Sequence, residues 1–433
     1  MSLFRLLLLL FSALPAAGYS VLTHQAIVDS TWDRHLLQLL RARYPVQLSP
    51  TDSAAWLEAK SYAYGGAIVQ DLGYYPLGTT FFTDLTHYVR AGEFVRSLLR
   101  EAHGANEYAF ALGALAHYAA DNVGHPECTN LVMPSVYPDL LRTFGPVVTY
   151  EDAPVRHTEL EFAFDVVQVA AGHYRTQHYH KAVGFRVSRP VLERAFEATY
   201  GLKLGQVLFN VDASVTTFRF AVNQLIPVAA RAAWYQQRRE IRRLSPRARR
   251  RDYLYRRNPR RFGQEFGTDY ERPGFGTRVV AVLFRVLPKI GPLKPYAFTL
   301  PGPEGLQRFR RSFRNSLAQY STLVHQQLPN TAAALAPLQN SNLDTGQPLV
   351  ASTYALADAA HGRLLRELHQ QHFEHLSAPL CRDLLRFFAA GLPPVIDEKK
   401  KRKQKKRARE QQEIKLALAA LRALSPASAM PGK

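Results

Sequence analysis

Apolar residues recur at helical spacing along most of the chain. Residues 94–100 (FVRSLLR) and 110–120 (FALGALAHYAA) are rich in Ala, Leu and aromatic side chains at the 3.6-residue period of an α-helix. Segments with the period-two alternation of strands are hard to find. Proline and glycine mark joints near residues 75–76, 145–146, 272–274 and 301–303. The pattern predicts an all-α fold without internal repeats.

The first eighteen residues combine a positive start with a short apolar stretch. Arg5 precedes an apolar core at residues 6–14, and the small residues 16–18 follow it. This is the pattern of a secretory signal peptide and its cleavage site. The apolar run is shorter than the about 20 residues that cross a bilayer. We therefore predict cleavage after Gly18 and export to the periplasm or the extracellular space, with an uncleaved membrane anchor as the alternative.

Changes in composition divide the rest of the chain into four predicted segments. These are a helical domain over 19–235, an Arg-rich connector over 236–275, a helical C-terminal portion over 276–395 and a basic, disordered tail over 396–433. One short helix is expected in the tail, near residues 414–424. Residues 278–301 are apolar but interrupted by basic side chains, which favours a buried amphipathic segment over a membrane span.

Positive charge is concentrated in two segments. Of the net charge of +20, residues 238–261 contribute twelve Arg against two acidic residues, and residues 399–409 contribute nine Lys and Arg with no acid. The rest of the chain is therefore close to neutral. Such segments attract phosphate groups, on an anionic membrane surface or on nucleic acid. A solvated, partly disordered surface is the alternative interpretation.

Histidine and carboxylate residues follow one another at helical spacing. His117, Asp121 and His125 are each four residues apart, and so are His157 and Glu161. Residues four apart share one face of a helix, so each pair can bind one metal ion or bridge two. Zinc is bound readily by His nitrogen and carboxylate oxygen. Because the chain has only two cysteines, any metal must be held by such groups and by main-chain atoms.

Four residues closer to the N-terminus extend this series. Tyr19 is the first residue after the predicted cleavage site, and His24 lies five residues later. A new N-terminus can bind a metal through its own amine and carbonyl, but only after cleavage. Asp71 and His87 follow in separate segments. Taken alone, Asp71 could cap a helix and His87 could be a core histidine, so only the conjunction of all these residues indicates a metal centre.

The order N-terminal His, loop Asp, His, HxxxDxxxH, HxxxE resembles that of the zinc-dependent phospholipase C superfamily. This superfamily includes bacterial phospholipases C, trinuclear-zinc single-strand nucleases and the catalytic domain of GPI-specific phospholipase D. The resemblance covers about residues 19–170. Residues 342–348 (NLDTGQP) look like a recurring feature of bacterial members, but we assign them no chemistry. His369, His372 and His375 also have helical spacing, yet they lack carboxylate partners and are predicted to be solvated.

The resemblance implies three zinc ions. One would be held by Asp71, His87, His117 and Asp121. A second would be held by His125, His157 and Glu161. The third would be held by the Tyr19 amine and carbonyl, His24 and Asp121, with Asp121 as the bridge. On the same basis, Asp71 and Asp121 are the predicted catalytic residues.

Two departures from the family pattern leave the substrate class open. The mature N-terminal residue is commonly Trp in the family, whereas here it would be Tyr19, although chelation through main-chain atoms survives that change. The gap between Asp121 and His125 is short, as in the branch that resembles GPI-specific phospholipase D.

The predicted function is that of an exported zinc-dependent phosphodiesterase, with phospholipid as the preferred substrate. Aromatic residues near the ligands suit an acyl or glyceryl group, or they belong to the core: Tyr74, Tyr75, Phe81, Phe82 and Tyr88. A single-strand nuclease is the first alternative, because stacking aromatics and positive charge also suit nucleic acid. A non-catalytic zinc protein that binds membranes is the second alternative.

Overall fold

The computed structural model describes residues 20–49, 51–75, 77–170, 186–220, 238–248, 298–326, 337–393 and 401–424. The predicted signal peptide, Tyr19, most of the Arg-rich connector and residues 276–297 lie outside these ranges. Within the described residues the regular structure is helical, and the one β interaction is an isolated bridge between Ser341 and Pro348. The prediction of an all-α fold is confirmed.

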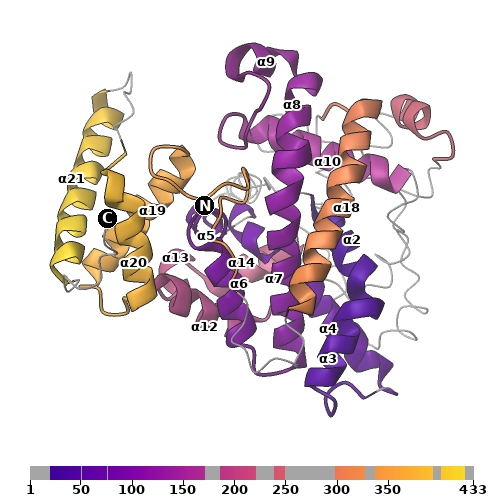
Figure 1. Cartoon of the computed structure of the whole chain (residues 1–433), viewed down its shortest axis with the longest axis horizontal. Coiled ribbons are helices and arrows are strands. Elements are labelled where there is room, and N and C mark those ends of the chain that lie inside the picture. The colour runs from indigo at the N-terminus through magenta and orange to yellow at the C-terminus, as the bar shows by residue number, and fades with distance from the viewer. Residues whose placement is uncertain are drawn as a thin grey trace, which may run out of the picture.

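The helices carry the labels of Figure 1. The segments up to residue 136 are α2 (Val21–Thr31), η1 (Trp32–Leu36), α3 (Leu37–Arg43), α4 (Ser53–Gly66), η2 (Val69–Tyr74), α5 (Thr80–Tyr88), α6 (Ala91–Arg100), α7 (Ala105–Gly124), η3 (His125–Thr129) and α8 (Asn130–Val136). The later segments are α9 (Pro138–Phe144), α10 (Pro154–Ala170), α12 (Arg189–Tyr200), α13 (Leu204–Val207), α14 (Val211–Phe220), α18 (Pro303–His325), α19 (Ala355–Gln370), α20 (Ala378–Phe387), η7 (Phe388–Ala390) and α21 (Lys401–Leu424). Residues 238–244 are also helical.

Helix α7 is the central element of the fold. Its Ala- and Leu-rich sequence is buried on nearly every side, which is the pattern of a helix surrounded by others. It packs against α4, α6 and α18, and Figure 1 shows it between these neighbours. A helix held on several sides is a rigid support for the side chains at its C-terminal end.

Two glycines allow α4 and α7 to approach closely. A Cβ atom at Gly113 would lie 2.0 Å from the Ala63 carbonyl oxygen, and one at Gly66 would lie 1.9 Å from the Phe110 carbonyl oxygen. Any larger residue would therefore push the two backbones apart. This contact fixes the position of α7 against the segment that leads into η2.

The C-terminal portion shares the hydrophobic core of the N-terminal helices. Helix α18 lies along α7, where the Tyr320 hydroxyl donates to the Leu112 carbonyl at 2.9 Å. The Phe309 ring stacks on Phe164 of α10 at 4.7 Å. Helix α19 packs on α5. The described residues of the two portions thus form one continuous core.

The segment that we predicted to be a disordered tail contains the long helix α21. This expectation is corrected for residues 401–413, whereas residues 414–424 are helical as predicted. Ala417, Leu418 and Leu421 of α21 are buried, and Ile414 reaches Gly362 of α19. These positions recur at three- and four-residue spacing, so they form one apolar stripe that packs on α19. Packing of this stripe offsets the repulsion within the basic half of the helix.

Among the helices of the described residues, none is both long and apolar enough to cross a membrane.

Candidate metal centre

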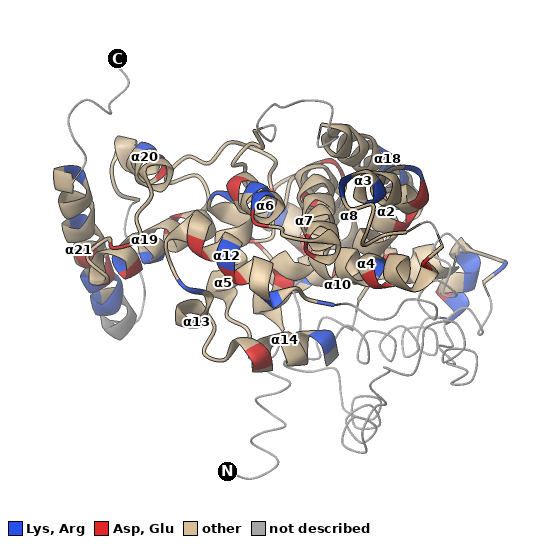
Figure 2. Cartoon of the chain, turned by 90° about the horizontal axis from the view of Figure 1, so that it is seen from below, with Lys and Arg blue, Asp and Glu red and all other residues tan. Residues whose placement is uncertain are grey.

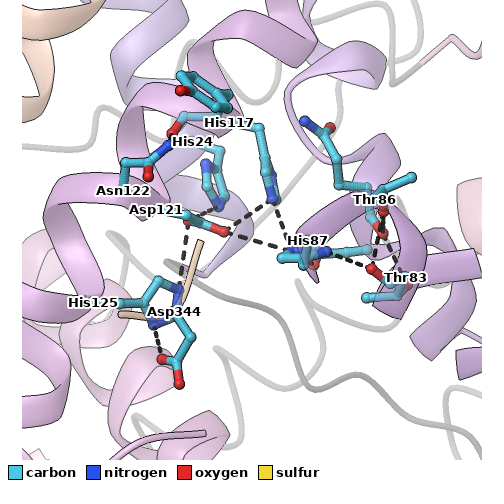
Figure 3. A network of polar contacts seen from close by, with 12 residues as sticks. His24, Thr83, Thr86, His87, His117, Asp121, Asn122, His125 and Asp344 are labelled. Atoms are coloured by element: carbon cyan, nitrogen blue, oxygen red, sulfur yellow. Dashed lines mark hydrogen bonds and ion pairs between the residues drawn. The ribbon is translucent and has the colours of Figure 1, made fainter. Parts of the chain in front are cut away.

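Asp121 lies at the centre of a group of buried histidines. It sits in the last turn of α7, with His117 one turn before it and His125 directly after the helix, at the start of the π-helical turn η3. Its Oδ2 lies 3.0 Å from Nε2 of His117 and 3.6 Å from Nε2 of His87. Its Oδ1 lies 3.5 Å from Nε2 of His24 and 3.6 Å from Nε2 of His125 (Figure 3). One carboxylate therefore contacts four imidazoles from three parts of the chain.

The first group joins Asp71 of η2, His87 of α5 and His117 of α7. Nδ1 of His87 lies 2.9 Å from the Thr83 carbonyl oxygen, and Nδ1 of His117 lies 3.0 Å from that of Ala67. Each ring donates its Nδ1–H to one of these carbonyls, so each Nε2 atom carries a lone pair. The two Nε2 atoms lie 3.2 Å apart. Lone pairs at that separation repel unless a proton or a metal cation lies between them.

The surroundings of His87 favour such a cation. Burial opposes protonation of its ring, but the Asp121 and Asp71 carboxylates outweigh burial and raise the pKa of His87 to about 9. Asp71 Oδ1 lies 3.5 Å from His87 Nε2. Neither carboxylate oxygen of Asp71 accepts a hydrogen bond from the described residues, and η2 has no side-chain cap. Asp71 therefore does not cap η2 through its side chain, and the buried His87 ring directs Nε2 toward two carboxylates.

A second group joins His24 of α2 with His117 and Asp121. The His24 and His117 rings stack with centroids 4.4 Å apart and an interplanar angle of 13°. Both rings thereby turn a nitrogen toward Asp121. Burial and the neighbouring His117 lower the pKa of His24 well below its ordinary value, which keeps the ring neutral, the form that binds metals.

The start of α2 is anchored beside this group. Asp165 of α10 accepts hydrogen bonds from the Leu22 amide at 2.9 Å and the Thr23 hydroxyl at 2.7 Å. A carboxylate at a helix N-terminus pairs with its unsatisfied N–H groups. The chain at Ser20 is buried next to this anchor. Tyr19, the predicted main-chain ligand, lies outside the described residues.

The third group joins His125 of η3 and His157 of α10, whose rings stack with centroids 5.0 Å apart. Glu161 Oε1 lies 2.7 Å from His157 Nδ1 and 3.8 Å from His125 Nδ1. A carboxylate that we did not predict completes the group. Asp344 Oδ1 lies 3.2 Å from His125 Nδ1 (Figure 3). The same oxygen lies 3.6 Å from His157 Nε2.

The structure thus brings together all the predicted metal ligands that it describes, and it adds Asp344. The signal for Asp344 in the sequence is the NLDTGQP run at residues 342–348. Spacing could not connect Asp344 to His125, because the two lie in distant parts of the chain. The spaced histidines at 369, 372 and 375 lie apart from the centre, as expected. His372 and His375 are exposed.

The aromatic residues near the ligands divide into two kinds. The rings of Tyr74 and Tyr88 lie 6.4 Å and 5.8 Å from the His87 ring, beside the metal centre. Burial raises the pKa of both hydroxyls well above the ordinary value, so they stay neutral donors. The other three pack in the main hydrophobic core: Tyr75, Phe81 and Phe82.

Comparison with known families places this centre in context. Residues 23–209 match the family model described as zinc dependent phospholipase C. This segment belongs to the zinc-dependent phospholipase C family. Comparison with curated proteins gave no match, and neither did comparison with solved structures. The predicted family relationship is confirmed, and the matched segment contains every predicted ligand except Tyr19, whereas Asp344 lies beyond it.

Four carboxylates are buried at this centre, three from the matched segment and one, Asp344, from beyond it. Asp71 and Asp121 are 0% exposed, Glu161 is 1% exposed and Asp344 is 3% exposed. Seven of their eight oxygens accept no hydrogen bond from the described residues, the exception being Asp344 Oδ2. Burying carboxylates without hydrogen bonds is costly, and the neighbouring imidazoles or a coordinated metal ion offset the cost. The donor set of imidazole and carboxylate therefore fits zinc.

The charges at this centre stabilise one another. Burial alone would raise the pKa of Asp121, but His117 and His125 hold it well below the ordinary range. The pKa of Asp344 is also lowered, because contacts with His125 and His157 outweigh burial and bring it to about 2. Both carboxylates are therefore ionised at neutral pH, as metal ligands must be.

Proposed function

We propose that the chain is an exported zinc-dependent phosphodiesterase that hydrolyses phospholipid in the manner of a phospholipase C. The observation that carries the proposal is the joining of three metal-binding groups through Asp121, within a domain of the zinc-dependent phospholipase C family. Asp121 presents Oδ2 to His87 and His117, and Oδ1 to His24 and His125.

The proposed centre holds three zinc ions. The first would be bound by Asp71, His87, His117 and Asp121. The second would be bound by His125, His157 and Glu161. The third would be bound by His24, Asp121 and the amine and carbonyl of Tyr19. Zinc ions held there would lower the pKa of a water molecule and neutralise charge on the phosphodiester.

The residues of the chain supply position and a dry environment. Asp121 fixes the three groups relative to one another, because it contacts ligands of each. Asp71 offers a second buried carboxylate, which can accept a proton from the attacking water. Tyr74 and Tyr88 remain neutral and can donate hydrogen bonds near the phosphate. Exclusion of bulk water strengthens each of these interactions.

The proposal is tested with protein that begins at Tyr19. The zinc-loaded form, a form stripped with chelator and the stripped form after zinc is restored are each assayed on phosphatidylcholine vesicles, phosphatidylinositol vesicles and single-stranded DNA. We expect zinc-dependent release of diacylglycerol from phospholipid. Cleavage of DNA alone would indicate the nuclease alternative. Bound zinc with no turnover of any of the three substrates would indicate a non-catalytic protein.

A further inference from the structure

The segment that carries Asp344 lies outside the matched phospholipase C segment but is docked onto it. The Leu343 amide donates to the His87 carbonyl at 3.2 Å, so this loop is tied to one of the predicted zinc ligands. The Asn130 side-chain amide donates to the Asp344 carbonyl at 2.8 Å. Gly346 adopts a positive φ of 67°, and a Cβ there would lie 3.0 Å from the Asn122 carbonyl oxygen. The loop therefore follows the end of α7 closely.

The side chain of Asp344 is held in one orientation. Its Oδ2 accepts hydrogen bonds from the Tyr150 amide at 2.8 Å and from the Tyr354 hydroxyl at 2.9 Å. Its Oδ1 is buried and accepts no hydrogen bond from the described residues. This oxygen faces His125 and His157 instead, at 3.2 Å and 3.6 Å. The anchored oxygen thus directs the other one into the third group.

The 3.2 Å between Oδ1 and His125 Nδ1 is a distance expected between two ligands of one ion. His157 Nε2 donates to Asn130 Oδ1 at 2.8 Å, so His157 would bind such an ion through Nδ1, which faces Glu161. Ligand atoms about 2.0–2.1 Å from a tetrahedral zinc lie about 3.3–3.4 Å from one another. We propose that Asp344 is the fourth protein ligand of the zinc held by His125, His157 and Glu161. This inference rests on the zinc centre proposed above. It makes the C-terminal portion a part of that centre.

A fourth protein ligand would change the role that this ion can have. Three protein ligands leave a position for water, which is typical of catalytic zinc, whereas four protein ligands close the site, which is typical of structural zinc. A four-ligand set here would therefore leave no protein-free position for water on this ion. It would also make occupancy of this zinc depend on docking of the 342–348 loop.

Two substitutions distinguish a metal ligand from a residue that only anchors the loop. Asp344→Asn keeps one oxygen to accept from Tyr150 and Tyr354 but loses the charged oxygen that faces the histidines. Asp344→His keeps a zinc ligand but loses the oxygen that anchors the loop. A ligand role predicts loss of zinc in the Asn variant and retention in the His variant. An anchoring role predicts the reverse order.

Zinc per protein is measured by elemental analysis, and affinity by competition with a chromophoric chelator, so no substrate is needed. We expect three ions in the wild type and in Asp344→His. In Asp344→Asn we expect one ion to be lost, or bound more than 100-fold more weakly, which exceeds the about 10–100-fold effect of residues that contact only a ligand. Unchanged zinc binding in Asp344→Asn, or loss of zinc in Asp344→His, would overturn the proposal. A wild type without zinc would instead refute the zinc centre itself.

Discussion

At the scale of single residues, Asp121 is the point at which the predicted ligands meet. It is fully buried and contacts four histidines, two through each carboxylate oxygen. Most of the other ligands serve a single group. A change at Asp121 therefore acts on the whole centre, whereas a change elsewhere acts mainly on one part.

We expect Asp121→Asn to lower kcat more than any other single ligand change, by at least about 100-fold. Asparagine keeps the shape of the side chain but removes the negative charge and one of the two acceptor oxygens. The measurement is kcat on phospholipid together with zinc content, with circular dichroism as the check on folding. An Asp121→Asn enzyme that stays active, beside an inactive His157→Ala enzyme, would contradict the bridging role.

We also predict that the free amine of Tyr19 is needed for full zinc occupancy. In a precursor or an extended chain this nitrogen is an amide, which is a poor ligand. Protein that begins at Tyr19 is compared with protein carrying one additional N-terminal residue, at saturating zinc. We expect the extended form to lose the zinc bound by His24 and to keep the other two. Equal zinc content and equal activity in both forms would show that the N-terminus is not a ligand.

At the scale of helices, the approach of α4 and α7 positions the centre. We predict that Gly113→Ala destabilises the protein by about 3 kcal/mol or more, because its Cβ would meet the Ala63 carbonyl at 2.0 Å. Displacement of α7 would also weaken zinc binding. The control is Gly205→Ala in α13, where a Cβ meets nothing within 4 Å. Urea unfolding of both variants checks the prediction, and equal stability would contradict it.

The pairing of α19 and α20 makes stability depend on pH. The His361 ring stacks on Phe387 with centroids 3.5 Å apart, and burial lowers the pKa of His361 to about 4. The unfolded chain binds a proton there near pH 6.5, so stability is lost as the pH falls from about 6.5 toward 4. At pH 5 this loss is about 2 kcal/mol.

Substitution of His361 by Leu removes this proton linkage. We expect the difference in unfolding free energy between pH 7 and pH 5 to be about 2 kcal/mol smaller in His361→Leu than in the wild type. Other titrating groups, including the zinc ligands, are common to both proteins and cancel in the comparison. The same loss of stability in both proteins would exclude His361 as the source.

At the scale of the whole molecule, basic charge is carried on an ordered helix at one end. Lys and Arg side chains lie along α21, as Figure 2 shows. Lys405 and Lys406 are exposed. Lys406 pairs with Glu410 at 3.8 Å, and Arg409 pairs with Glu413 at 3.0 Å. The remaining basic segment lies mostly outside the described residues. We propose that α21 draws the protein to an anionic membrane surface, where a phospholipid substrate would lie.

We expect the double change Lys405→Glu and Lys406→Glu to weaken binding to phosphatidylserine-containing vesicles by about 30-fold, at about 1 kcal/mol for each basic residue. The effect should shrink at high salt. The control is the same change of charge at the exposed residues Arg142 and Lys203, away from α21. Binding is measured by vesicle sedimentation. An equal loss of binding in both double variants would show that only the net charge of the protein matters.

The helical fold and most of the candidate metal ligands were predictable from the sequence. Apolar residues that recur at the period of a helix form one apolar stripe along it or cover it entirely. The all-α prediction therefore followed from the local pattern of apolar residues. The i, i+4 spacing of His117 with Asp121, and of His157 with Glu161, placed each pair on one helix face before any tertiary contact was known.

The tertiary structure alone decided which distant residues join that centre and whether the tail is ordered. Asp344 reaches His125 only because the 342–348 loop docks against α5 and the end of α7. Residues 401–424 form an ordered helix because their apolar stripe finds α19, a partner that the basic composition does not reveal. Local spacing fixes neighbours within a helix, whereas contacts between remote segments depend on how the helices pack.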